Sequence, residues 1–187
     1  MAALTAHDPS RLSLAPHVRF TEDGVVLKLG DGLWGTFSSI GDYRNYFTDP
    51  QTGNVVLFAN IDEHGLPSIL TLRLKVESGR VSEIESWITR PDKSRTSIFG
   101  AQHYAVAADP VWAQVVPSAE RSNRARLEQI VGSYFHGIEH NTGKGIPFAS
   151  DARRFENGLP TTSGQPGRFV MKGPEGTVDV GAMSIQQ

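Results

Sequence analysis

Three consecutive stretches of alternating apolar and polar residues, joined by very short turns, constrain the fold of this chain more than any other feature. The stretches are 54–61, 68–77 and 81–90, and the turns lie at Glu63-His64-Gly65 and Ser78-Gly79. A period of two is typical of a β-strand, and connections this short join antiparallel neighbours. We therefore expect an antiparallel meander. The core face of its middle strand is predicted to carry Leu70, Leu72, Leu74 and Val76.

The segment before the meander changes to a helical period. Its apolar and aromatic positions recur at spacings of three or four: Thr36, Ile40, Tyr43 and Phe47. This spacing predicts a helix over 33–47, which Asp49-Pro50 would end because the residue before a proline avoids the helical region. Upstream, residues 17–29 predict a hairpin around Asp23-Gly24. A helix beside such a sheet predicts an α+β layer, and we expect a ligand on its concave face.

The composition excludes several classes of function. The chain has 187 residues, of which 39% are hydrophobic and 20% charged, with a formal net charge of −2 and no cysteine. Such a balance is typical of a soluble globular protein and creates no field that attracts nucleic acid or a membrane surface. The lack of cysteine excludes disulfides, thiolate nucleophiles and cysteine zinc sites. Residues 1–10 carry no secretory pattern, and no stretch approaches the roughly 20 apolar residues of a membrane span, so we expect a cytoplasmic protein.

The remainder of the chain completes one expected domain. That domain covers 1–162, with the sheet and central helix at 15–92, a long connection at 93–121, and a helix plus strand at 122–162. The second helix is predicted at 123–140, with Ser122 as its N-cap. Its apolar stripe consists of Leu127, Val131, Tyr134 and Ile138, widened by Ile130 and Phe135. Because glycine, proline, serine and threonine dominate residues 163–187, we expect an extended arm there, loosely ordered or held by a partner subunit.

Two stretches of the sequence resemble each other. Residues 6–24 and residues 139–158 each contain a helix end, a loop, a strand and a turn that finishes in Asp23-Gly24 or Asn157-Gly158. Two interpretations remain open. The similarity is either chance between short segments or a degenerate repeat whose second copy lacks a meander of its own.

Several of these motifs resemble a known superfamily. They are the run 19–24, then 29–34, Asp42-Tyr43-Arg44, and Tyr46-Phe47 before Asp49-Pro50, together with Tyr134-Phe135, Phe148-Ala149 and 156–158. They resemble the nuclear transport factor 2-like superfamily, the cone-shaped fold of ketosteroid isomerase and the SnoaL-like polyketide cyclases, over roughly 15–92 and 118–162. The resemblance implies a curved antiparallel sheet and packed helices that together form a cone.

The order of the elements departs from that superfamily. Its long helices precede the meander, whereas here only a stub does, and the full helix at 123–140 follows. We therefore expect a rearranged or swapped C-terminal helix and a homo-oligomer, a dimer or trimer, because a cone without its first helix leaves apolar surface open.

The resemblance implies two alternative functions. The first is a lyase or isomerase that needs no cofactor and uses acid–base chemistry on an apolar, aromatic substrate such as a lignin-derived diarylpropane, as in the related bacterial lyases. The second is a non-catalytic ligand-binding or association module of the same fold. A cavity with titratable groups within reach of one another would favour the enzyme, and a filled, aliphatic cone would favour the module.

The candidate catalytic residues are polar groups expected to face the cone: Tyr43, Glu156, Arg154, His17, Arg90 and His140. Glu156 would be the acid or base, with its pKa raised by burial and lowered by Arg154. Tyr43 would donate to an oxyanion, and Arg90 would hold an anionic oxygen. Each also has a purely structural interpretation as core packing or an edge ion pair. The expected aromatic, substrate-binding wall consists of Trp34, Tyr46, Phe58, Trp87 and Trp112.

One motif indicates a third possible function, that of a metal-dependent hydrolase. His136-Gly137-Ile138-Glu139-His140 matches the H-x-x-E-H pattern of some zinc peptidases, in which two histidines one helical turn apart bind metal. The plainer interpretation is a pair of exposed histidines at a helix end, because no downstream glutamate in a clear helical context completes the ligand set. We therefore expect no metal in the catalytic site. Gly30-Asp31-Gly32 and Gly143-Lys144-Gly145 fit no phosphate-binding motif and are predicted to be turns.

Overall fold

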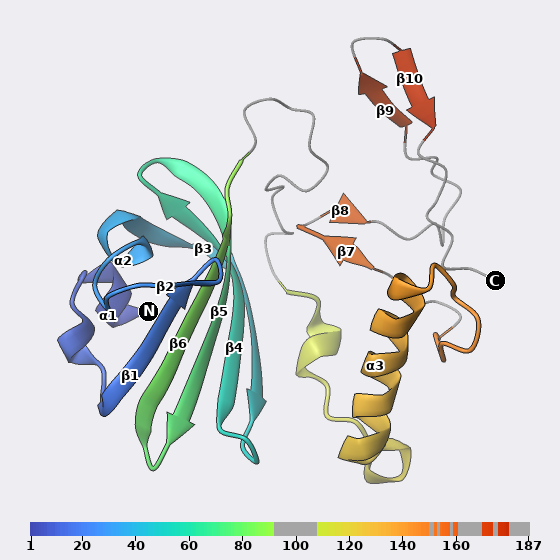
Figure 1. Ribbon diagram of the computed structural model, residues 1–187, viewed down its shortest axis with the longest axis horizontal. Helices are drawn as coiled ribbons and strands as arrows, with labels where there is room; N and C mark the ends of the chain where they lie inside the picture. The colour runs from blue at the N-terminus through green and yellow to red at the C-terminus, as the bar shows by residue number, and fades with distance from the viewer. Residues whose placement is uncertain are drawn as a thin grey trace. The chain divides into compact units, whose positions relative to one another are not determined.

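A computed structural model describes residues 1–91, 108–149, 152, 154–157, 159–160, 170–173 and 176–179. The chain divides into two units. The first contains Met1–Trp112 and Asn157–Leu159, and the second contains Ala113–Glu156 and Pro160–Gln187. The first unit is α+β, with a curved, mixed sheet and few helices (Figure 1).

Six strands build that sheet. They are β1 (Leu14–Glu22), β2 (Val25–Val26), β3 (Phe37–Asp49), β4 (Asn54–Glu63), β5 (Leu66–Glu77) and β6 (Arg80–Thr89), in the order β2-β1-β6-β5-β4-β3. The predicted meander (β4–β5–β6) and the predicted hairpin (β1–β2) are confirmed. The prediction of a purely antiparallel sheet is wrong, because β1 and β6 pair in parallel.

The predicted central helix is also wrong over most of its length. Only α2 (Leu33–Thr36) is helical, and the chain then continues as the 13-residue strand β3. The register of β3 against β4 shifts between Phe37 and Ser39 and again between Ile40 and Arg44. Each such bulge interrupts the period of two. The apolar residues of a strand with two interruptions therefore recur at helix-like spacings.

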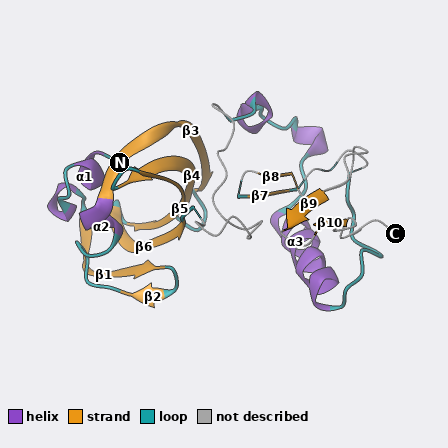
Figure 2. Cartoon of the chain, turned by 90° about the horizontal axis from the view of Figure 1, so that it is seen from above, coloured by secondary structure: helices purple, strands orange, loops and turns teal. Residues whose placement is uncertain are grey.

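Short helices cover the concave face of the sheet. These are α1 (Ala2–Thr5), the 3₁₀-helix η1 (Pro9–Arg11) and α2, and Figure 2 shows the sheet curving around α1 and α2. The stub of helix predicted at the N-terminus is thus present. The core between these layers consists of Ala3, Leu4, Phe20, Leu33, Trp34, Phe37, Leu57, Ala59, Ile61, Leu70, Ile84 and Ile88. The predicted core face of β5 is confirmed at Leu70, which is fully buried, and at Leu72 and Leu74, which pack against this cluster.

The turns use residues that tolerate left-handed backbone. Asp23 and Gly24 both have positive φ, 48° and 82°, which matches the twist of a two-residue hairpin loop. Gly53 has φ of 74°, and a Cβ at this position would collide with the carbonyl oxygen of Val76. Only glycine therefore fits the turn between β3 and β4.

The second unit is built around one helix. After η2 (Pro110–Ala113) and η3 (Ser118–Glu120) comes α3 (Arg124–Glu139), close to the predicted 123–140. Its N-cap is Asn123, whose side-chain oxygen accepts the N–H of Arg126 at 2.9 Å, so the prediction of Ser122 is wrong by one residue. The two short strands β7 (Phe155–Glu156) and β8 (Leu159–Pro160) pair with each other. Within the predicted C-terminal arm, β9 (Val170–Gly173) and β10 (Gly176–Asp179) pair in antiparallel fashion.

The apolar stripe of α3 is exposed at most of its positions. Leu127, Val131, Phe135 and Ile138 are each at least half exposed. The ring of Tyr134 makes edge contacts with Phe135 and Phe148. The packing of this helix on a sheet, in the same chain or in a partner, stays a prediction. Among the helices that the structure describes, none is long and apolar enough to cross a membrane.

Candidate functional site

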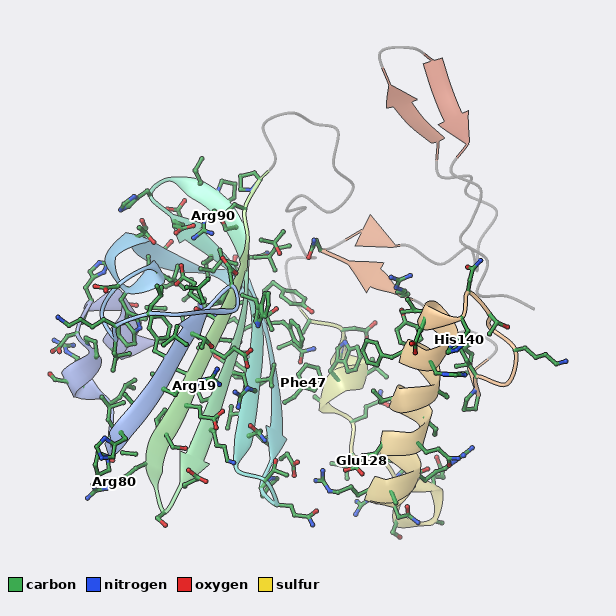
Figure 3. All side chains as sticks on the ribbon, viewed as in Figure 1. Arg19, Phe47, Arg80, Arg90, Glu128 and His140 are labelled. Carbon is green, nitrogen blue, oxygen red and sulfur yellow. The ribbon has the colours of Figure 1, made fainter. Side chains whose placement is uncertain are left out.

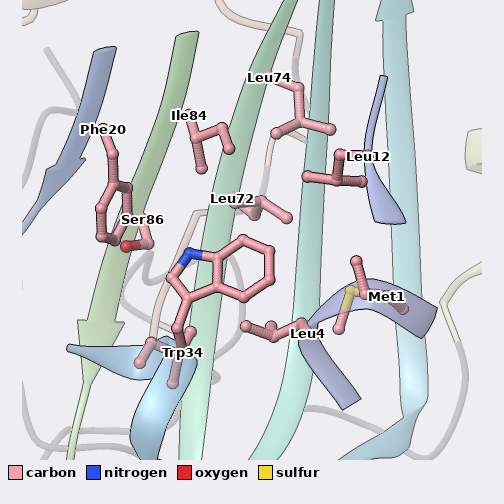
Figure 4. Close-up of a pocket in the computed structure, with 11 residues that line it drawn as sticks. Met1, Leu4, Leu12, Phe20, Trp34, Leu72, Leu74, Ile84 and Ser86 are labelled. Carbon is pink, nitrogen blue, oxygen red and sulfur yellow. The ribbon is translucent and has the colours of Figure 1, made fainter. Parts of the chain in front are cut away.

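A small apolar pocket lies on the concave face of the first unit. It has a cavity volume of about 60 Å³. Its lining consists of Met1, Ala3, Leu4, Leu12, Phe20, Leu33, Trp34, Leu72, Leu74, Ile84 and Ser86 (Figure 4). Alternation along the strands explains the sheet side of this lining, since side chains two residues apart share a face. Helices α1 and α2 supply the opposite side.

Trp34 is the largest side chain in the pocket. In Figure 4 its indole ring lies across the centre of the lining residues, with the ring nitrogen on the side of Ser86. The residue is only 5% exposed, and its backbone carbonyl is bonded to Nδ1 of His7. This bond connects α2 to the segment after α1, so the two short helices that cover the pocket are tied together.

The only polar side chain in this lining is Ser86, which connects the pocket to a carboxylate. Ser86 is 2% exposed, and its hydroxyl lies 3.4 Å from the carbonyl oxygen of Thr21 and 3.5 Å from Oε2 of Glu22. The side chain of Glu22 is 10% exposed, and the same Oε2 accepts the N–H of Leu33 at 2.8 Å. The nearly buried carboxylate of Glu22 thus lies next to Ser86, the polar residue of the pocket lining.

A second carboxylate group surrounds Arg90 at the same end of the sheet. Arg90 donates to both oxygens of Glu63, at 2.7 and 2.9 Å, and Thr36 donates to Glu63 at 2.6 Å. The guanidinium also lies 3.4 Å from Asp23 and 3.8 Å from Glu22. Arg90 therefore joins the ends of β1, β4 and β6.

Protonation at this cluster follows from its hydrogen bonds. The two bonds from Arg90, helped by the one from Thr36, hold the pKa of Glu63 below its ordinary value of 4.5, although burial acts in the opposite direction. The same bonds raise the pKa of Arg90. Glu63 is therefore an anion near neutral pH and not a proton donor. The geometry of Arg90 matches the edge ion pair, the structural alternative to its predicted role.

Within the first unit, none of the predicted catalytic residues lines the pocket. His17 is exposed on β1, and Tyr43 is half-buried on β3, a strand and not the helix on which its predicted role depended. Neither of them lines the pocket, and nor does Arg90. His140, Arg154 and Glu156 belong to the second unit. There His140 follows α3, Arg154 lies 6.0 Å from the ring centre of Tyr134, and the side chain of Glu156 lies outside the description.

The predicted aromatic wall is divided between the two faces of the sheet. Trp34 lines the pocket, but Phe58 and Trp87 alternate with buried core residues and so point to the opposite face. Tyr46 is exposed on the edge strand β3. Trp112 is also exposed and makes an edge contact with Phe47, which in turn contacts Phe58. Only Trp34 of the predicted five belongs to the pocket.

The opposite face carries its own charged cluster. Arg73 bonds to Glu83 at 2.6 Å, Glu85 at 2.7 Å and the side-chain oxygen of Asn54 at 3.1 Å. Arg73 lowers the pKa of Glu85, and the indole of Trp87 adds a bond of 3.1 Å to the same carboxylate. These side chains are about 30% exposed, so water screens them. This arrangement is a cross-strand ion network on the outer face of the sheet.

One group of side chains in the described part of the chain has the composition of a metal site. His136, Glu139 and His140 lie at the end of α3, all exposed, and each offers one ligand atom within 4.8 Å of the others. The rings of the two histidines have centroids 3.9 Å apart. The H-x-x-E-H spacing thus places three possible ligands together on one helical turn.

Glu22, Glu63 and Ser86 are not among the site residues that the sequence predicts. A usable signal was nevertheless present. Ser86 stands between Ile84 and Ile88 at a core position of β6, and Glu22 stands two residues after Phe20 on the core side of β1. A polar residue at a core position is unusual and indicates either a partner or a function.

Comparison with known proteins adds little to this geometry. A family model described as a domain of unknown function (DUF8021) matches residues 120–184, which follow the sheet. No curated protein matches the chain. Among solved structures, a de novo designed protein with a curved β-sheet is similar, with a TM-score of 0.37 and 16% identity, covering 50% of this chain and 79% of that one. A TM-score this low supports no inference from that protein.

Proposed function

We propose that the first unit is a binding module for a small apolar ligand, which it holds in the pocket between the sheet and the two short helices. The observation that carries this proposal is the lining. Ten of its eleven residues are apolar, and the remaining one is Ser86. Concave, mainly apolar sites with a few polar groups are typical of small-molecule binding. This arrangement matches the module among the two functions that the resemblance implies.

The size of the cavity limits the ligand. A water molecule needs about 10–15 Å³ of such volume. A cavity of about 60 Å³ is only a few times larger, so it accepts a small ligand. Drug-sized ligands occupy sites of roughly 300–1,000 Å³. A short alkyl chain or one ring therefore fits better than the two rings of a diarylpropane. The hydroxyl of Ser86 favours a ligand with one polar atom.

Titration calorimetry with alcohols of increasing chain length and with single-ring phenols tests this proposal. We expect saturable binding at one site and weaker binding of these polar-headed ligands in Ser86→Ala. Ser82→Ala is the matched control, because Ser82 lies on the same strand but outside the pocket lining. Leu74→Phe, which enlarges a lining side chain, should abolish binding while the melting transition stays cooperative. Equal binding in all four proteins would refute the proposal.

A lyase or isomerase that uses acid–base chemistry is the second candidate, and Glu22 is the observation that favours it. Its carboxylate lies 3.5 Å from the hydroxyl of Ser86 and is shielded from solvent. A proton can therefore pass between Glu22 and a ligand through that hydroxyl, if the ligand bonds to Ser86. Tyr43 and Glu156 remain predictions for this chemistry, as does the diarylpropane substrate.

Mass spectrometry together with NMR of each ligand that binds, after incubation, separates the two functions, because an isomerisation changes the structure of the ligand but not its mass. Glu22→Gln keeps an oxygen for the N–H of Leu33 but removes the titratable group. Turnover in the unmodified protein that is lost in Glu22→Gln, with binding retained, establishes the enzyme. Binding without any change in ligand mass or structure establishes the module.

We also propose that the protein forms a homo-oligomer. The exposed apolar side chains of Leu127, Val131, Phe135 and Ile138 on α3 support this proposal, because contiguous apolar surface usually marks an interaction site. Light scattering coupled to size-exclusion chromatography measures the mass directly. A mass equal to one chain at all concentrations contradicts the proposal.

A further inference from the structure

The last turn of α3 combines three side chains whose chemistry the proposed function does not use. We propose that His136, Glu139 and His140 bind a divalent transition-metal ion at the surface, through one nitrogen of each imidazole and the carboxylate. The three ligand atoms lie within 4.8 Å of one another. Ligands of a zinc-sized ion stand about 2.0–2.2 Å from the metal, so a small adjustment of exposed rotamers brings all three into contact.

Helix geometry produces this arrangement. Residues at i, i+3 and i+4 lie on the same face of a helix, one turn apart. The imidazoles of His136 and His140 are already close, with ring centroids 3.9 Å apart and an angle of 38° between the planes. Glu139 extends from the same turn, with its carboxylate 3.9 Å from Nδ1 of His140.

The hydrogen bonding of His140 leaves one of its nitrogens available. Its Nδ1 lies 2.9 Å from the backbone carbonyl of His136. A carbonyl only accepts, so Nδ1 carries the proton and Nε2 keeps a free lone pair for a metal. An imidazole held through its other nitrogen in this way is the usual arrangement of histidine ligands in metal sites.

The surrounding backbone fixes the turn that carries the ligands. The N–H of Thr142 bonds to the carbonyl of Gly137 at 2.9 Å, and Asn141 has a positive φ of 51° as the chain leaves the helix. A Cβ on Gly137 would collide with Ile146, so the following loop packs closely on this turn. The helix end also places partial negative charge near the site, which favours a cation.

The donor set determines which metals fit. Two imidazoles and one carboxylate suit Zn²⁺, Cu²⁺, Ni²⁺ and Co²⁺, whereas Mg²⁺ and Ca²⁺ prefer oxygen ligands alone. Among the metals that fit, Cu²⁺ should bind most tightly, as the Irving–Williams order requires. Since three protein ligands leave at least one position for water, the site would be open to a further ligand.

The test is metal binding by the full chain without an affinity tag. Figure 3 shows the position of His140 at the end of α3, and of Glu128 on the same helix outside the cluster. Calorimetry with Zn²⁺ should give one site per chain, with affinity reduced at least tenfold in His136→Ala and in His140→Ala and less strongly in Glu139→Gln. Glu128→Gln and His17→Ala are the controls and should bind as the unmodified protein does, and Mg²⁺ should not bind.

All three proposed ligands are exposed, so the variants should keep the fold, which circular dichroism verifies. Electron paramagnetic resonance of the Cu²⁺ form provides a second measurement, since two coordinated imidazoles give the hyperfine structure of two nitrogens, which should fall to that of one nitrogen when either histidine is replaced. Zinc affinity that is unchanged in both histidine variants, or a Cu²⁺ spectrum without two nitrogens, would overturn the proposal.

Discussion

The two faces of the sheet in the first unit carry similar arginine–carboxylate networks in different surroundings. Each face has an arginine that bonds to two or more carboxylates: Arg90 on the concave face and Arg73 on the other. On the concave face the main partner, Glu63, is 8% exposed, whereas the partners of Arg73 are about 30% exposed. The short helices account for this difference, because they exclude solvent from the concave face alone. Covering one face thus buries the carboxylate of Glu63, although the guanidinium of Arg90 itself stays 42% exposed.

The largest contrast between the faces should appear in the core of β5. Leu70 is 0% exposed on the concave face, and the adjacent Thr71 points to the other face. Leu70→Ala should reduce the free energy of unfolding by about 3 kcal/mol, because it removes apolar burial and leaves a cavity. Thr71→Ala, the matched control, should change it by about 1 kcal/mol or less. Urea denaturation measures both, and similar losses would show that the two faces are equally buried.

A smaller contrast should separate the two ion networks. Glu63→Gln removes the charged partner of Arg90 and should cost about 2 kcal/mol, the scale of hydrogen bonds to a charged group. The control, Glu85→Gln, alters the solvated network on the other face and should cost less than about 1 kcal/mol. Thermal or urea unfolding of the two variants gives the comparison. A larger loss in Glu85→Gln would contradict the assignment of the concave network as the buried one.

The pH dependence of stability sharpens the same comparison. The pKa of Glu63 is lowered in the folded protein, mainly by its hydrogen bonds from Arg90. Glu63 therefore contributes to the free energy of unfolding at pH values above the ordinary glutamate pKa of 4.5. That contribution is lost as the pH falls through the pKa that Glu63 has in the folded protein, because Glu63 binds a proton more readily in the unfolded chain. Stability should therefore decline as pH drops below about 4.5, and the decline should be shallower in Glu63→Gln. Equal slopes of stability against pH for the two proteins would show that Glu63 does not control this decline.

Sequence patterns predicted the regular parts of this fold and failed where the strand geometry is interrupted. The runs that became β4, β5 and β6 are separated by tight turns and pair with a single register shift, between Lys75 and Val76, so their pairing follows from local signals. In β3, two register shifts displace the apolar residues from a period of two, and their spacing then matches a helix. The threonine, isoleucine and aromatic residues of that segment favour a strand, whereas their spacing predicts a helix. The parallel pairing of β1 with β6 depends on contacts far apart in sequence, which no local pattern specifies.

The site was harder to predict than the fold. Trp34 was identified, but the other aromatic residues were assigned to one wall although alternation along their strands places Phe58 and Trp87 on the outer face. The pocket also depends on α1, which the sequence predicts as a helix stub without indicating that it covers the sheet. Glu22 precedes a turn signal, Asp23-Gly24, and carboxylates near turns are common on protein surfaces. Only the packing of α2 over this residue makes it a buried group.

Fluorescence of Trp34 tests the central claim, that the pocket binds a small apolar ligand, most directly. Trp87 and Trp112 are about half exposed, so replacing both with phenylalanine should preserve the fold and leave the pocket tryptophan as the single reporter. Titration of this variant with a short-chain alcohol or a single-ring ligand should give a saturable change in the emission of Trp34, and Leu74→Phe in the same background should eliminate it. An emission spectrum that stays constant while the ligand binds elsewhere, or that responds equally in Leu74→Phe, would contradict the account.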